Sequence, residues 1–215
     1  MFRGNQDKRV SAFDLARRTI LYYTSNIMGF AMTTSNSPSQ PTPLAGTILV
    51  VGGGGHGRVI AGLAQACGYF RVDFADDRSP QAAGALSDLV TLASRFVAAD
   101  VSIENLPLWQ EILDRLENLS GPLPPFVLPT VVVSPSAQLA PGALVQPGAI
   151  GRPHAVVGKG TIISAGAVID HNAVIGPCAN VDAGTVVAPH DIVPPLIRIP
   201  AGDRVLPALP KGPFP

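Results

Sequence analysis

A six-residue repeat runs without insertion through the second half of the chain, from Val133 to Pro210. Written in sixes, this segment gives thirteen hexads, and the first position is Val, Leu or Ile in every hexad except the one that begins at Gly151. The fifth position is Ala or Thr in the first nine. A period of six fits neither an α-helix nor an ordinary strand, which repeat every 3.6 and every 2 residues. It is typical of a solenoid with short flat faces.

The repeat predicts a three-sided prism in which three hexads close one coil. The aliphatic first residue fills the core, the small fifth residue fits beside it, and Gly, Pro, Asn or Asp supplies the turns. The 22 glycines and 22 prolines of the chain agree with many tight turns. We therefore predict a parallel β-helix of a little over four coils. Its handedness does not follow from the pattern, because parallel crossovers are normally right-handed.

The segment 47–121 has the pattern of a βαβ unit, and a Pro-rich connector over 122–132 joins it to the repeat at 133–210. Short apolar runs alternate there with stretches of helical periodicity. The expected elements are, in order, strand 48–51, helix 58–67, strand 69–74, strand 96–99 and helix 106–119. The sequence therefore predicts an α/β domain followed by an all-β repeat domain.

The two ends of the chain are expected to lie outside these domains. Residues 1–46 join a broken apolar stretch to a Ser-, Thr- and Pro-rich linker, so we expect a largely disordered extension with one short helix over 10–23. A signal or transit peptide is the alternative. Residues 211–215 form a tail. The apolar stretch is too short to span a bilayer, and a net charge of zero gives no basic surface for nucleic acid. We expect a cytoplasmic protein.

The Gly-rich turn after the first strand has the chemistry of a phosphate site. Gly52, Gly54 and Gly57 match G-x-G-x-x-G between a strand and a helix, where backbone N–H groups favour an anion. NAD or FAD fits this pattern too, but the unit holds few strands for a dinucleotide fold, and a nucleotide-sugar phosphate fits the same physics. A turn that binds nothing is the alternative. Asp76 and Asp77, after the second strand, either accept hydrogen bonds from a uracil or ribose or form a solvated loop.

The chain resembles the hexapeptide-repeat acyltransferases, and among them the sugar O- and N-acetyltransferases of the sialic-acid and bacillosamine type. The resemblance covers about residues 48–193 and rests on the segments VVGGGGHGRVIAGLAQACGY, FADDR and SAGAVIDHNAVIGPCANVDAGTVVAP. It implies a Rossmann-like nucleotide-sugar-binding domain followed by a left-handed parallel β-helix. It also implies acetyl-CoA-dependent acetylation of an amino or hydroxyl group on a UDP- or CMP-linked sugar, by a homotrimer that binds acetyl-CoA between neighbouring β-helices.

The same resemblance assigns roles to individual residues. The family's nucleotide-sugar site corresponds to the Gly-rich turn and the acidic pair, namely Gly52, Gly53, Gly54, Gly55, His56, Asp76 and Asp77. Its general base corresponds to His171, and Asn172 follows as the residue that orients the base. Its contact to acetyl-CoA corresponds to Asn180. The family implies no metal site.

Departures from the family pattern favour a second hypothesis, a degenerate, non-catalytic trimeric binding or scaffold protein that keeps the hexapeptide core. The residue after the base is usually acidic and the acetyl-CoA contact is usually His, but Asn172 and Asn180 stand there in this chain. The repeat of the family also extends further beyond the base. We prefer the enzyme.

The spacing of His154, Asn172 and His190, each 18 residues apart, stacks them on one edge of the prism. Coils lie roughly 4.8 Å apart, so the two histidines are separated by roughly 9.6 Å and cannot share a zinc ion within one chain. A zinc site between subunits that uses His171 and His190 stays open as an alternative.

Overall fold

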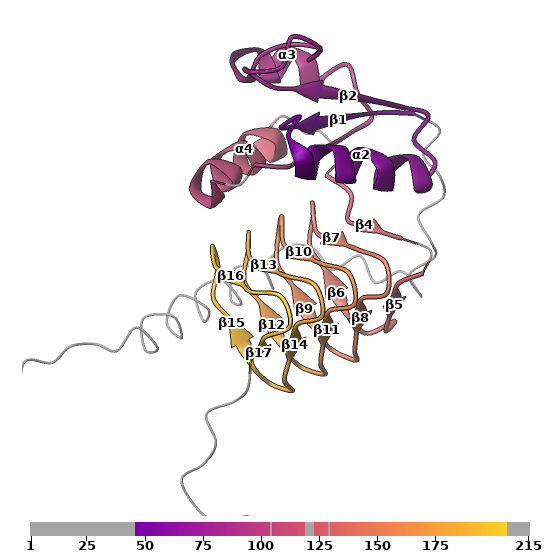
Figure 1. The fold of residues 1–215 in the computed structure, drawn as a ribbon, viewed down its shortest axis with the longest axis vertical. Helices are drawn as coiled ribbons and strands as arrows, with labels where there is room; N and C mark the ends of the chain where they lie inside the picture. Colours follow the sequence, from indigo (N-terminus) through magenta and orange to yellow (C-terminus); the bar gives the residue numbers. More distant parts are fainter. Residues whose placement is uncertain (1–45, 104, 119–122, 129, 206–215) are drawn as a thin grey trace, which may run out of the picture. The chain divides into compact units, whose positions relative to one another are not determined.

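The computed structural model describes residues 46–103, 105–118, 123–128 and 130–205 (Figure 1). The expected N-terminal extension, apart from Gly46, and the expected tail at 211–215 lie outside the described residues. No helix in the described part of the chain combines the length and the apolar character needed to cross a membrane.

The first domain is a three-stranded parallel sheet with helices. Its elements are β1 (Thr47–Val51), α2 (Gly55–Ala66), β2 (Arg71–Ala75), a 3-10 turn (Leu86–Asp88), α3 (Leu89–Ala93), β3 (Ala98–Val101) and α4 (Leu106–Asn118). The strand order β2-β1-β3 places the apolar β1 in the centre, and residues 48–51 are completely buried. The predicted βαβ unit is confirmed.

Two details of this domain differ from the sequence prediction. The third strand was expected over 96–99 but spans Ala98–Val101, because the polar Asp100 lies inside the strand and is buried. The 3-10 turn and α3 were not predicted, since a segment as short as Leu89–Ala93 carries too few turns for a clear helical period.

The second domain is a parallel β-helix with three faces built from two-residue strands (Figure 1). Face 1 contains β4 (Phe126–Val127), β7 (Leu144–Val145), β10 (Ile162–Ile163), β13 (Asn180–Val181) and β16 (Arg198–Ile199). Face 2 contains β5 (Val132–Val133), β8 (Ile150–Gly151), β11 (Val168–Ile169), β14 (Val186–Val187) and β17 (Arg204–Val205). Face 3 contains β6 (Gln138–Leu139), β9 (Val156–Val157), β12 (Val174–Ile175) and β15 (Ile192–Val193).

The second residue of nearly every strand points into the prism, which explains the period of six. Strands pair with a constant offset of 18 residues, as Ile163 does with Val181. Val157, Ile163, Ile169 and Ile175 are all at most 3% exposed. Their burial confirms the predicted core.

The β-helix begins before the predicted boundary at residue 133. β4 at Phe126–Val127 pairs with β7, and β5 at Val132–Val133 pairs with β8. Most of the expected connector over 122–132 therefore belongs to the first coil. The sequence hid this because its prolines replace the small residues of the repeat, while Phe126 is held by its ring contact with Tyr69 of the α/β domain at 5.7 Å between centroids.

The corners of the prism share one backbone conformation. The fourth residue of each hexad has a positive φ from Gly142 to Gly202. Five of these residues are not glycine: His154, Asn172, Cys178, His190 and Leu196, with φ between 53° and 60°. The N–H of a corner residue donates to a carbonyl of the previous coil, as Asn172 does to Pro153 at 3.1 Å. This ladder holds non-glycine residues in the left-handed region, which is otherwise unfavourable for them.

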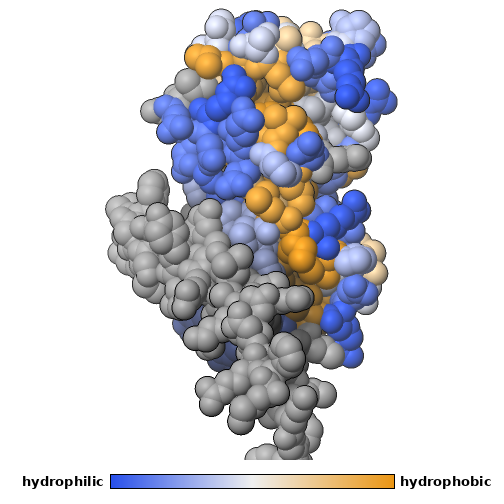
Figure 2. Space-filling view, turned by 90° about the vertical axis from the view of Figure 1, so that its left-hand side faces the viewer, coloured by the Kyte–Doolittle hydropathy of each residue, from blue (hydrophilic) through white to orange (hydrophobic). Residues whose placement is uncertain are grey.

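Some apolar side chains stay exposed on the outside of the β-helix. Val132 is 65% exposed, and Ile150, Leu196 and Ile197 are each 37% exposed. Figure 2 shows a strip of apolar surface on one side of the molecule with hydrophilic residues on both sides of it. A contiguous apolar surface of this kind is typical of a contact surface.

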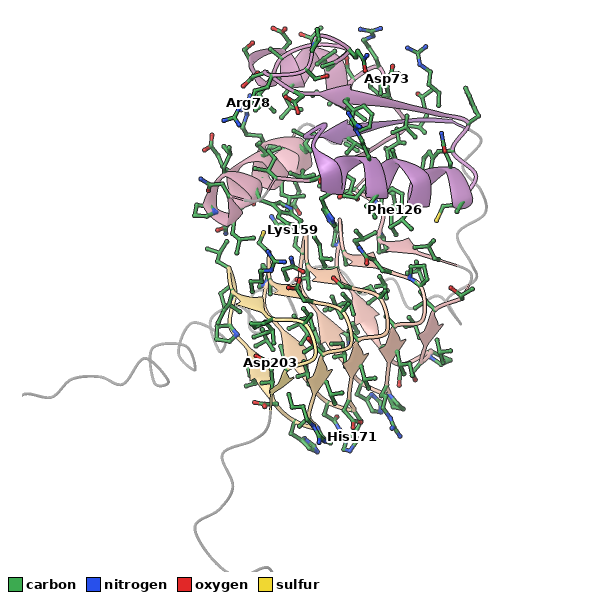
Figure 3. The ribbon with its side chains drawn as sticks, in the orientation of Figure 1. Asp73, Arg78, Phe126, Lys159, His171 and Asp203 are labelled. Atoms are coloured by element: carbon green, nitrogen blue, oxygen red, sulfur yellow. The ribbon has the colours of Figure 1, made fainter. Side chains whose placement is uncertain are left out.

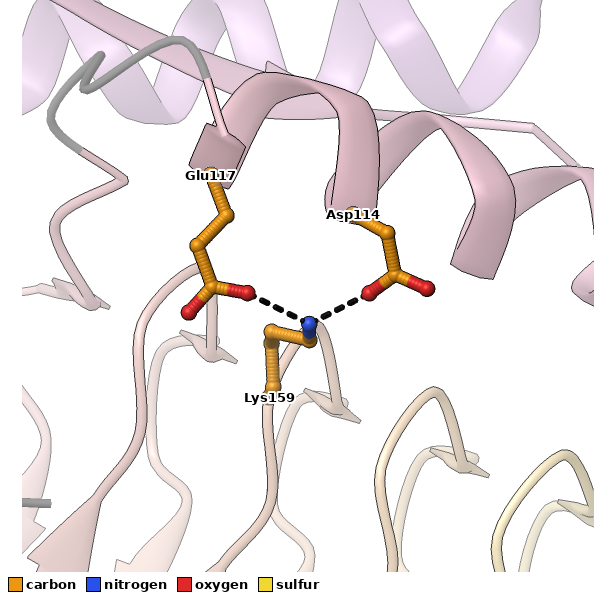
Figure 4. Close-up of polar contacts among 3 residues, drawn as sticks. All are labelled: Asp114, Glu117 and Lys159. Atoms are coloured by element: carbon orange, nitrogen blue, oxygen red, sulfur yellow. Dashed lines mark hydrogen bonds and ion pairs between the residues drawn. The ribbon is translucent and has the colours of Figure 1, made fainter.

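Helix α4 packs against face 1 of the β-helix. Leu144 and Ile162 point outward from this face, yet they are buried in one core with Leu113 and Leu116 of α4. Lys159 lies on the side of the β-helix that meets the α/β domain (Figure 3), and its ammonium contacts Asp114 at 2.5 Å and Glu117 at 2.7 Å (Figure 4). Burial lowers the pKa of Lys159, but these two carboxylates more than offset it, so the pKa is raised overall. Lys159 therefore stays charged and ties the two domains together.

Candidate active site

The edge where face 2 turns into face 3 carries polar side chains in successive coils. This edge, which we call the histidine edge, comprises residues 152–154, 170–172 and 188–190. Its corner residues are His154, Asn172 and His190, whereas the edge between faces 1 and 2 has glycine at the same position from Gly148 to Gly202. The histidine edge is therefore where this fold presents groups suited to proton transfer.

His171 has three neighbours on the histidine edge (Figure 3). Its Nδ1 lies 2.9 Å from Nδ2 of Asn172, and its ring lies edge to face with that of His190, with centroids 5.1 Å apart and planes at 89°. Its backbone N–H donates to Oδ1 of Asp170 at 2.7 Å, and Asp170 pairs with Arg152 of the previous coil at 3.3 Å. The predicted pair His171 and Asn172 is thus in direct contact.

The contact with Asn172 selects the tautomer of His171. When the amide Nδ2 donates, Nδ1 is the acceptor and the ring proton sits on Nε2. A half-turn of the amide brings its oxygen to the same place, so that Nδ1–H donates and Nε2 has a free lone pair. The second arrangement is the one that a general base needs, and a neutral amide serves both.

The Gly-rich turn forms an open helix N-terminus. Gly54 is the N-cap of α2 and no side chain caps it. A Cβ at Gly54 or Gly55 would have no atom within 4 Å, whereas Gly52, at φ 104°, lies against the carbonyl of Ser102. Free backbone N–H groups beside open space can bind a phosphate. His56, the second residue of α2, is half-buried.

The acidic pair lies beside this turn and makes backbone hydrogen bonds. The carboxylate of Asp76 accepts from Arg78 N and from Gly53 N, both at 2.7 Å. These two hydrogen bonds lower the pKa of Asp76. Asp77 accepts from Leu86 N at 2.8 Å. The structure thus brings Gly53 and Asp76 together, as predicted, and both carboxylates fix the loop after β2.

Asn180 does not lie near His171 in the same chain. It is on β13 of face 1, and the histidine edge is the edge opposite face 1. Among the described residues its Oδ1 is buried without a hydrogen-bond partner. The core residues of the prism separate it from His171, so the two can meet only between subunits.

Sequence reasoning missed the contact between His190 and His171. The 18-residue register places His190 above Asn172, and the contact with His171 arises from an offset of 19 residues. That offset is the one that the corner ladder uses, since His190 N donates to His171 O at 3.1 Å. Among the described residues, no group of three or more His, Cys, Asp or Glu side chains is placed to hold a metal ion.

Comparisons with known proteins define the class of fold. Residues 47–103 match the family model of the PglD N-terminal domain, and no curated protein sequence matches the chain. The acetyltransferase domain of PglB from Neisseria gonorrhoeae FA1090 has a TM-score of 0.68 at 24% identity, over 77% of this chain and 94% of that domain. This likeness shows an α/β domain joined to a left-handed parallel β-helix, as predicted.

Two further solved structures are similar at lower scores. A variant of GDP-perosamine N-acetyl transferase from Caulobacter crescentus, in complex with CoA and GDP-perosamine, has a TM-score of 0.42 and 21% identity, over 74% of this chain and 92% of that chain. WeeI from Acinetobacter baumannii AYE has a TM-score of 0.42 and 15% identity, over 74% of this chain and 87% of that chain.

Two glycines of α2 give a matched test of the Gly-rich turn. A Cβ at Gly57 would overlap the carbonyl oxygen of Gly52, whereas a Cβ at Gly62 would meet nothing within 4 Å. We expect Gly57→Ala to lower the free energy of unfolding by about 2–3 kcal/mol. Gly62→Ala should raise it by about 0.5–1 kcal/mol, because alanine favours the helix. Urea denaturation of both variants measures the difference, and equal effects would show that the close contact at Gly57 does not exist.

Proposed function

We propose that this protein is an acetyl-CoA-dependent acetyltransferase that acetylates an amino or hydroxyl group of a nucleotide-linked sugar, with His171 as the general base. The observation that carries the proposal is the pair His171–Asn172 on the histidine edge, in contact at 2.9 Å, in a fold shared with an acetyltransferase domain. The open helix N-terminus at Gly54 and Gly55 supports a phosphate-bearing substrate.

The reaction requires one proton to move twice. His171 takes the proton of the substrate amine or hydroxyl as that atom bonds to the thioester carbon of acetyl-CoA. The tetrahedral intermediate then breaks its carbon–sulfur bond, and the imidazolium returns the proton to the leaving CoA thiolate. Asn172 holds the ring through Nδ1, so that Nε2 carries both transfers.

The positions of the two sites support a homo-oligomer, and we propose a homotrimer. The α/β domain, with the Gly-rich turn, packs on face 1, and His171 lies on the opposite edge. A sugar anchored at the turn of one chain can therefore reach only the His171 of another. Aliphatic residues that point outward in register on face 2, Val132, Ile150, Val168 and Val186, offer a surface for that contact.

One observation favours the alternative of a non-catalytic trimeric scaffold. Asn172 carries no charge that would stabilise the imidazolium of His171, and in the orientation of the structure its Nδ2 faces Nδ1. A base then needs the amide to turn. The two proposals differ in whether the chain binds acetyl-CoA.

Thermal denaturation with ligands separates the two proposals. A ligand at 100 times its Kd stabilises the native state by about 2.7 kcal/mol, so we expect acetyl-CoA and a UDP- or CMP-sugar each to raise the midpoint by several degrees. Free acetate and free sugar serve as controls and should cause no shift. A shift with the nucleotide-sugar and none with saturating acetyl-CoA would contradict the enzyme proposal and support the scaffold.

A further inference from the structure

His190 is the residue of the next coil that touches His171. The rings lie edge to face at 89° with centroids 5.1 Å apart, which is the preferred geometry of an aromatic pair. The backbone N–H of His190 also donates to the carbonyl of His171 at 3.1 Å. The two residues are therefore fixed to each other by both backbone and side chain.

The turn itself does not call for histidine at position 190. The backbone of His190 has a φ of 60°, in the left-handed region that glycine adopts most readily. The corresponding corner between faces 1 and 2 has glycine in the same coil, at Gly184. Turn geometry alone would favour glycine at 190, so the imidazole calls for an explanation beyond the fold.

We infer that His190 is a positioning residue for His171, an inference that rests on the proposed function. An imidazole at a solvent-facing corner samples several rotamers about χ1 and χ2. Asn172 fixes one ring nitrogen of His171 at 2.9 Å, and the ring of His190 fixes the plane. With both contacts the base keeps one orientation before substrate arrives, which is the condition for efficient transfer.

The kinetic test replaces His190 by asparagine, with His154→Asn as the matched control. Asparagine tolerates a positive φ, so both variants keep the corner. His154 has the same φ of 60° and lies two coils away on the same edge. We expect His190→Asn to lower kcat roughly 3- to 10-fold, the loss of one aromatic contact, with KM for both substrates unchanged, and His154→Asn to leave kcat unchanged. Equal kcat values in the two variants overturn the inference.

A second measurement follows the rings without using activity. The chain has four histidines, so the imidazole C–H signals are few enough to assign by NMR. His190→Asn should shift the signals of His171, because a neighbouring ring current is lost, and His154→Asn should not. Unchanged His171 signals in His190→Asn overturn the inference whatever the activity. Wild-type protein without acetyl transfer, but with the His171 shift, rejects the proposed function and leaves the contact between the rings established.

Discussion

Replacing His171 by alanine should lower kcat for acetyl transfer by roughly 10²- to 10⁴-fold, the usual contribution of a general base. The loss is expected in kcat because the imidazole acts on the proton that moves during the reaction. The fold should persist: His171 lies at a corner outside the core, and such substitutions usually change stability by no more than about 0.5 kcal/mol. Steady-state kinetics and thermal denaturation of the same preparation measure both quantities.

The control for this variant is His154→Asn, which removes another imidazole from the histidine edge without touching the proposed base. It should keep wild-type kcat. Asn172→Asp provides a second comparison, because a carboxylate in place of the amide accepts from Nδ1–H and stabilises the imidazolium. We expect it to keep or raise activity. If His171→Ala retained most of its activity while folded, the assignment of the base would be wrong.

The stability of the protein should fall as the pH rises from 4 to 8, and Asp100 should cause much of this fall. Burial raises the pKa of this carboxyl from 3.8 to about 7. Asp100 is 1% exposed, one of its oxygens accepts from Val101 N at 2.7 Å, and the other has no partner among the described residues. The folded state therefore holds a neutral acid.

The sign follows from the protons bound in each state. Between pH 4 and 7 the unfolded chain has released this proton and the folded chain still holds it, so deprotonation favours unfolding. Each pKa unit corresponds to about 1.4 kcal/mol, which gives about 4 kcal/mol over the full shift. The contribution is present below pH 4, falls through the interval and is constant above the folded pKa.

Asp100→Asn mimics the neutral acid and should remove this dependence. Relative to the wild type, it should gain little at pH 4 and about 4 kcal/mol at pH 8 in urea denaturation. The neighbouring Tyr69 does not confuse the measurement, because burial raises its pKa above 10. A difference between the two proteins that stays the same at both pH values would show that Asp100 is charged in the native state.

The β-helix could be predicted from the sequence because its local and long-range patterns coincide. A side chain that recurs every six residues, such as Ile163, Ile169 and Ile175, must point the same way in each face, and the pairing offset of 18 follows at once. The start of the β-helix could not be predicted, because the position of Phe126 depends on its contact with Tyr69, far away in the chain.

The site could be predicted in part. The contact of His171 with Asn172 follows from adjacency, and the proximity of Gly53 and Asp76 follows from their places at the ends of neighbouring strands. The contact of His171 with His190 depends on how two rings lean across a coil step, which spacing alone does not determine. The buried state of Asp100 was also hidden, because an isolated acidic residue normally indicates a loop.

The repeated left-handed corner separates the work of folding from the work of chemistry. Ladder hydrogen bonds between coils hold His154, Asn172 and Cys178 in the same conformation as the glycines. Side chains at these corners are thus not needed to shape the chain. Each coil provides an interchangeable outward position on a rigid frame, and new reactive groups can be introduced there one at a time while the scaffold stays as it is.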